Sequence, residues 1–307
     1  MQFKDNKDLY DTIKALAGVN KFTPDEQLSI KSLANRRLYE AYNKTDIWPR
    51  YLIVSEPRSI ANSIVPTTQD GRHILGAGTT AVNGLYKLNG TQASAAAYSL
   101  FDSDGTTELY SLIYVSGTTW HIIVGAPASG GAIEYINTAG GNTATADSPS
   151  IAEIGWTVST GTAPAPTVRD LAEITDFIKI HRTQSFLVNS AIEFDFFVQG
   201  DGAHVLNLTT ETTSTVYCTY RKALTYLSDL DEDTLAGVLN VPLEFFYFVA
   251  HATYADFLRS DGQTEKAFLE ENRAEDYLFS ELERAEKVMN INAVKKRIVT
   301  HVSRQSR

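Results

Sequence analysis

The sequence predicts an α+β protein: a mainly helical core with a short β-meander and a C-terminal antiparallel helical hairpin, into which a small all-β sandwich or barrel is inserted. Charge density supports this division, because residues 80–166 hold six acids and a single base, Lys87, whereas both flanks are densely charged. The central stretch is also rich in turn signals, and the flanks carry apolar residues at helical spacing. We therefore expect a helical core (1–79 and 167–289), a β-domain (80–166) and a flexible basic tail (290–307).

Length and composition bound the class of protein. The 307 residues are 43 % hydrophobic, enough for one large core or two ordinary ones. No run reaches the roughly 18 apolar residues of a membrane helix, and the start lacks the apolar core of a signal peptide, so we expect a soluble cytosolic product. The single cysteine, Cys218, allows neither an intrachain disulfide nor a thiolate metal cluster. A net charge of −10 argues against a protein that grips nucleic acid.

Two helices are expected near the start of the chain. The first spans Asp5 to Ala17 and places a leucine or isoleucine inward at each turn. The second has a strong start signal, because Thr23 can serve as N-cap, Pro24 occupies the first helical position and Glu26 completes a capping box. Its apolar stripe ends before Pro49.

The middle block alternates short β-like runs with turn signals. The runs are GLYKL, AAAYSLF, ELYSLIYV, TWHIIVGA, AIEYI and GWTVS. The turn signals are Asn83-Gly84, Asn89-Gly90, Asp102 to Gly105, Ser116-Gly117 and Ser129 to Gly131. Strands of this length at this spacing are typical of a small antiparallel sandwich or barrel. Two prolines in TGTAPAPTV then predict a stiff, extended exit.

The last third returns to helices after a short β segment. Residues 168–180 fit a helix or a strand, and IEFDFFVQ, AHVLNLTTE and TSTVYCTYRKA predict a three-stranded meander that turns first at Gly200 to Gly202. Pro242 opens a helix that Gly262 closes as a left-handed C′ residue, and Thr264 starts the next. These two helices predict an antiparallel hairpin. Residues 243–286 carry 11 acids and 4 bases, whereas six bases and no acid follow from Lys287 onward.

Motifs for catalysis or cofactor binding are weak. The glycines of Gly76-Ala-Gly78-Thr-Thr-Ala81 match a dinucleotide fingerprint, but a turn and a strand are expected next instead of the required helix. Asp102-Ser-Asp-Gly105 lacks the closing Glu of a calcium loop. The six histidines are scattered, with no HExxH pair. The sequence therefore predicts no catalytic residue, no metal site and no cofactor.

Three aromatic residues in the middle block keep a second function open. Trp120, Tyr135 and Trp156 could form an exposed platform on which a sugar stacks, which would make the chain a glycan-binding protein. The alternative, which we favour, is that they fill the core of a small β-domain that has few large aliphatic residues. Their exposure decides between the two interpretations.

Several segments resemble the head-to-tail adaptor (connector or neck) proteins of tailed bacteriophages, a group that includes the helical part of podoviral tubular adaptors. In the last third these segments are Val216 to Lys222, Val241 to Val249, Ala255 to Leu258, Gln263 to Ala267 and Ala274 to Leu278. The early helix pair is similar to the first helices of such adaptors. The resemblance covers roughly 1–79 and 168–307 and is one of pattern, whereas the middle block departs from it.

This resemblance implies a structural virion protein at the head–tail junction, assembled in the host cytoplasm. Such adaptors form a ring, commonly of about twelve copies, that docks beneath the portal protein, binds a downstream tail or neck protein and continues the channel through which viral DNA passes without specific binding. No catalysis, cofactor or membrane is implied. Another tail or stopper protein is the alternative within this class.

In this family the extreme C-terminus extends into grooves of the portal protein. The residues that the resemblance assigns to this contact are Lys295, Lys296, Arg297, Ile298, Val299, Arg304 and Arg307. Their bases would steer the tail and Ile298 and Val299 would anchor it, so that the segment orders on its partner. A disordered, solubilising end is the alternative.

Overall fold

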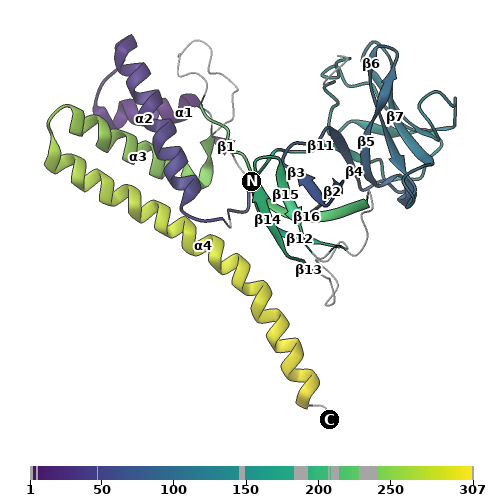
Figure 1. Cartoon of the computed structure of the whole chain (residues 1–307). Helices are drawn as coiled ribbons and strands as arrows, with labels where there is room; N and C mark the ends of the chain where they lie inside the picture. The colour runs from purple at the N-terminus through teal and green to yellow at the C-terminus, as the bar shows by residue number, and fades with distance from the viewer. Residues whose placement is uncertain are drawn as a thin grey trace. The chain divides into compact units, whose positions relative to one another are not determined.

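The chain forms two compact units in the computed structural model, a helical unit made of two separate chain segments and a β unit made of the segment between them in the sequence (Figure 1). The helical unit comprises residues 1–52 and 224–307, and the β unit comprises residues 53–223. The structure describes residues 3–4, 6–46, 48–144, 149–182, 193–206, 208, 214–227 and 241–305. Residues 3, 4, 6, 214 and 288–305 are described by their backbone alone.

The helical unit contains four helices and a short two-stranded sheet among its described residues. The helices are α1 (Asn6–Ala17), α2 (Pro24–Asn43), α3 (Leu243–Ser260) and α4 (Thr264–Gln305), and the strands are β1 (Phe3–Lys4) and β17 (Val241–Pro242). The predicted capping box is confirmed, since the Thr23 N–H donates to Glu26 Oε2 at 2.8 Å and the Glu26 N–H donates to Thr23 Oγ1 at 3.4 Å. Gly262 has φ +79° and ends α3 as predicted.

Helix α3 is the centre of the helical unit, because it packs against α1, α2 and α4. Most of its apolar side chains are buried, in agreement with a helix that has neighbours on several sides. Phe245 lies at its start, with its ring centroid 4.8 Å from Trp48 and 5.9 Å from Tyr51. On α4, the stripe of Ala267, Ala274, Leu278 and Ala285 faces inward, so the helical hairpin predicted from spacing is confirmed.

A buried ion cluster joins α2 to α3. Arg37 donates to both carboxylate oxygens of Asp256, each at 2.7 Å, and Arg36 donates to the same carboxylate at 2.6 Å. The Arg37 and Asp256 residues are each 7 % exposed. Burial raises the pKa of Asp256, but the hydrogen bonds from Arg37 and Arg36 outweigh it and hold that pKa below its ordinary value. Glu40 and Glu271 complete the cluster through Arg37.

The β unit is built from three antiparallel sheets. The largest has the order β10-β9-β8-β7-β6-β5-β4-β11, the second β13-β12-β16-β2 and the third β14-β15-β3. The strands are β2 (Leu52–Ile60), β3 (Ile64–Pro66), β4 (Gly71–Leu75), β5 (Gly84–Gln92), β6 (Ala95–Phe101), β7 (Glu108–Ser116), β8 (Thr119–Val124), β9 (Ile133–Asn137), β10 (Trp156–Val158), β11 (Thr167–Asp170), β12 (Ile174–His181), β13 (Glu193–Phe194), β14 (Phe196–Gln199), β15 (Gly202–Val205) and β16 (Ser214–Lys222).

The eight-stranded sheet curves around a core of its own, as Figure 1 shows for β4 to β7. Ile74 and Val168 from one edge share this core with Tyr135 and Trp156 from the other edge. The segment before β10 also reaches β11, where the Val168 N–H donates to the carbonyl of Glu153 at 3.0 Å. The sheet is therefore barrel-like. A second core lies with the two smaller sheets and includes Ile60, Val65, Ile174, Ile180, Val216, Cys218 and Tyr220.

The predicted fold class, a mainly helical core with a small inserted β-domain, is wrong. Residues 52–75 and 167–222, assigned to the helical core because they are densely charged, instead form strands of all three sheets. Charge density reports how much surface a segment exposes, and strands with one wet face carry charge as readily as helices do. Most of the described strands thus belong to one β unit, larger than the 80–166 block that turn signals alone delimit.

Two local predictions also fail. The expected three-stranded meander does not form: β14 and β15 make the hairpin at Gly200 to Gly202, but β16 pairs with β12 and β2. Asn89-Gly90 is not the hairpin turn, because β5 continues through it as a bulge in which Gly90 has φ +77°. The turn falls instead at Ala93 and Ser94, which take φ +48° and +69°.

Replacing Asp256 by alanine is expected to destabilise the helical unit by about 2–3 kcal/mol, because the buried Arg37 would lose its bidentate carboxylate and keep only its contacts with the more exposed Glu40 and Glu271. Urea unfolding followed by helical circular dichroism measures the change. The control is Asp261→Ala, in the exposed turn after α3, for which we expect a change within about 0.5 kcal/mol. Equal effects of the two substitutions would contradict the structural role of the cluster.

Candidate functional site

The three aromatic residues of the middle block are buried, which confirms the favoured core interpretation and excludes the alternative of a sugar platform. Trp120 and Tyr135 are completely buried and Trp156 is 6 % exposed, all within the core of the barrel-like sheet. The Tyr135 hydroxyl donates to the carbonyl of Thr162 at 2.7 Å, and the Trp156 indole N–H donates to the carbonyl of Ala152 at 3.2 Å. No ligand could stack on rings held between strands in this way, so the three aromatics fill the core.

The basic C-terminal segment continues α4. The backbone of this helix runs as far as Gln305, so Lys295, Lys296, Arg297, Ile298, Val299 and Arg304 lie on its last turns. Their side chains lie outside the described residues, as does all of Arg307. The expectation that this segment binds a portal protein, and that it orders only there, remains a prediction.

The remaining motif residues occupy structural positions. After Gly78 the chain makes a 3-10 turn, Thr80–Val82, and then β5, so the helix of a dinucleotide site does not follow. Burial raises the pKa of the Cys218 thiol to about 12, which leaves it unreactive in the second core of the β unit. Over the described ranges, no three His, Cys, Asp or Glu side chains gather as a metal site requires. Within those same ranges, no helix is both long and apolar enough to cross a membrane.

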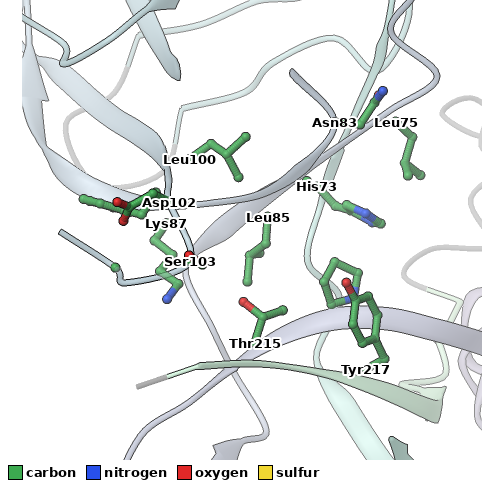
Figure 2. A pocket seen from close by; sticks show the side chains of 14 residues that line it. His73, Leu75, Asn83, Leu85, Lys87, Leu100, Asp102, Ser103, Thr215 and Tyr217 are labelled. Atoms are coloured by element: carbon green, nitrogen blue, oxygen red, sulfur yellow. The ribbon is translucent and has the colours of Figure 1, made fainter. Parts of the chain in front are cut away.

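A cleft on the outer face of the barrel-like sheet is the candidate site of the β unit (Figure 2). It has a volume of about 410 Å³. Strands β4, β5 and the β6–β7 turn form one wall, and β2 and β16 form the other. The lining residues are Pro57, His73, Leu75, Asn83, Gly84, Leu85, Lys87, Leu100, Phe101, Asp102, Ser103, Gly105, Thr215 and Tyr217.

The pleat of β5 places a cation in this cleft. Tyr86 points into the core, so its neighbours Leu85 and Lys87 point to the opposite face, toward the strand that carries Thr215 and Tyr217 (Figure 2). Gly71 lies opposite Lys87 on β4 and offers no side chain to cover it. Burial lowers the pKa of Lys87. In the sequence, Lys87 stands out only as the single base of residues 80–166.

Two other ionisable side chains of the cleft, those of His73 and Asp102, have lowered pKa values. Burial, with the nearby Arg169 and Arg58 charges, lowers the pKa of His73 to about 4, so its imidazole is neutral at pH 7. Asp102 accepts hydrogen bonds from the Thr106 and Thr107 N–H groups at 3.1 and 3.3 Å, which lower its pKa. The cleft thus presents one amine, a neutral imidazole and several hydroxyls beside an apolar wall, a set of groups suited to binding more than to catalysis.

Replacing Trp120 by alanine is expected to destabilise the β unit by about 3–5 kcal/mol, because it removes a completely buried indole. Near-UV circular dichroism during chemical unfolding measures this loss. Ile154, which is 72 % exposed, provides the control, and Ile154→Ala is expected to change stability by less than about 0.5 kcal/mol. A stable Trp120→Ala protein that had lost binding to sugars would restore the platform interpretation.

No protein-family model, no curated protein and no solved structure matches this chain.

Proposed function

We propose that the chain is a structural virion protein, a head-to-tail adaptor whose copies form a ring beneath the portal protein. The resemblance of its helical segments to such adaptors first suggests this function. The observation that carries it is an aligned pair of large exposed apolar side chains on α2 and a second aligned pair on α4. These two apolar faces support contact between copies.

Each face consists of two large side chains at the same spacing. On α2, Leu28 and Tyr39 are 66 % and 51 % exposed, and on α4, Phe268 and Phe279 are 60 % and 63 % exposed. Both pairs are eleven residues apart, or about three helical turns, so the two side chains of each pair share one face of their helix. Apolar pairs aligned on two helices differ from single hydrophobic residues scattered over a surface.

The two faces differ in their side chains, since the α2 face carries a leucine and a tyrosine and the α4 face carries two phenylalanines. Of the α2-region bases, Arg36, Arg37 and Lys44 already pair with carboxylates of their own chain, Asp256 and Glu275, so charge does not distinguish the faces. Apolar contact is what would bring α2 of one copy against α4 of another. Because the two faces differ, the contact is heterologous, and such a contact closes into a ring when the rotation between copies allows it.

The partners follow from the same proposal. The basic end of α4 would dock into the portal protein, and another surface would meet the downstream tail or neck protein. Viral DNA would pass through the ring without specific binding, since each copy has a net charge of −10 and a negative channel repels phosphates. The virion's head–tail junction is the corresponding location.

Changing one face at a time should produce a diagnostic pattern. Phe268→Ser/Phe279→Ser and Leu28→Ser/Tyr39→Ser are each expected to convert the ring to monomers at micromolar concentration, since two large contacts are lost. Mixed in equal amounts, the two variants should form one-to-one dimers, because one intact face of each kind remains. Native mass spectrometry measures all three states.

The control for this experiment is Ile154→Ser, which removes an equally exposed apolar residue from the β unit and should leave the ring intact. If only the α4 variant loses assembly, the contact is between identical faces and the heterologous ring is wrong. If neither variant loses assembly, these faces are not the contact.

Removal of the basic end should separate portal binding from assembly. A chain that ends at Asn290 is expected to keep its ring and its unfolding midpoint but to lose at least about tenfold in affinity for the portal protein, because five bases are removed. Pull-down and native mass spectrometry with the portal protein of the same virion measure the loss. Thr300→Ala/Ser303→Ala serves as the neutral control, and unchanged attachment of the shortened chain would contradict the proposed contact.

A further inference from the structure

The cleft in the β unit contains a lysine, Lys87, that pairs with no carboxylate among the described residues. The three buried arginines of this unit each pair with a carboxylate: Arg58 with Glu56, Arg72 with Asp170 and Arg221 with Asp176. Lys87 is also partly buried, but among the described residues no carboxylate pairs with it. A cation withdrawn from water without a partner is unfavourable, and an anionic ligand removes that cost.

Asp102 is the one carboxylate among the residues that line the cleft, and it is bonded within its own turn. Its side chain accepts the Thr106 and Thr107 N–H groups that close the β6–β7 turn. Those bonds fix the carboxylate at the turn, where it forms no ion pair with Lys87. The amine is therefore left to a group that enters from outside.

The other groups that line the cleft indicate which further groups the ligand carries. The hydroxyls of Ser103, Thr215 and Tyr217 line it, and among the described residues they bond to no protein group. Leu85 and Leu100 supply an apolar wall beside them. A volume of about 410 Å³ is far larger than an inorganic anion requires and suits a small organic molecule. A compact ring with one carboxylate, several hydroxyls and an apolar face fits these groups.

We propose that this cleft binds an acidic monosaccharide, a hexuronate, either free or as the end unit of an acidic polysaccharide. Lys87 binds the carboxylate, and Thr215, Tyr217 and Ser103 exchange hydrogen bonds with the sugar hydroxyls. The site belongs to the β unit alone and does not depend on the proposed ring, so either proposal can fail without the other.

Titration calorimetry of the full chain with D-glucuronate tests this proposal. The wild-type chain is expected to bind glucuronate at least about tenfold more tightly than D-glucose, which lacks the carboxylate. The same preference is expected over inorganic phosphate, which lacks the sugar ring and its hydroxyls. Lys87→Met should abolish the preference for glucuronate over glucose. Lys179→Met, on β12 of the same unit, should not, because Lys179 is half exposed and pairs with Glu193 outside the cleft.

The outcomes separate the alternatives. A uronic acid oligosaccharide that binds more tightly than the free sugar identifies a polysaccharide as the source, and equal affinity identifies the single sugar. Equal binding of phosphate and glucuronate, or of glucose and glucuronate, overturns the ligand class. Full affinity in Lys87→Met overturns the role of the amine. If Lys87→Met does not fold, the comparison of ligands on the wild-type chain still decides.

Discussion

The helical unit depends on joining two segments that are far apart in the chain. Asp256 on α3 pairs with Arg37 on α2 across 219 positions, and the whole β unit lies between them in the sequence. An unstructured insertion of that length would oppose the pairing entropically, although each doubling of a loop costs only about 0.6 kcal/mol. The folded insertion lowers this cost, because its first and last strands, β2 and β16, are neighbours in one sheet. The Ser55 N–H there donates to Thr219 Oγ1 at 3.2 Å.

Apolar burial and the Arg37–Asp256 ion pair contribute differently to the packing of α3 in the helical unit. The apolar side chains of α3, including Phe245 and Phe248, supply burial, which is the main stabilising contribution. The Arg37–Asp256 pair adds less net stability, since both charges lose hydration, but it fixes the register of α2 against α3. Around α3, Leu28 and Tyr39 on α2 and Phe268 and Phe279 on α4 stay mostly exposed in the described part of the unit. The proposed contact between copies uses these two faces.

Local structure could be predicted from the sequence where side chains act on their own backbone. Thr23 and Glu26 specify a helix start by a reciprocal hydrogen bond, and Gly262 ends α3 because it takes a left-handed conformation at no steric cost. The runs of the middle block also match strands β5 to β10. The pairing of β4 with β11, or of β16 with β2, could not be predicted, because partners distant in the sequence leave no local pattern.

The candidate site could be predicted even less. Lys87 lies in no recognisable sequence motif. The residues that form the cleft with it come from β4, the β6–β7 turn and β16, which only the folded β unit brings together. The aromatic trio was visible in the sequence, but composition cannot tell a core from a platform, and burial decides for the core. The change of charge at the basic end of α4 is visible in the sequence. The partner that this end binds has to be identified by experiment.

The native mass of the purified full-length chain tests the proposed assembly most directly. The ring predicts a single species at a fixed multiple of 33.8 kDa, stable on dilution into the micromolar range. A species of 33.8 kDa at every concentration, with portal protein present as well as without it, would contradict the proposal that this chain acts as a subunit of a ring.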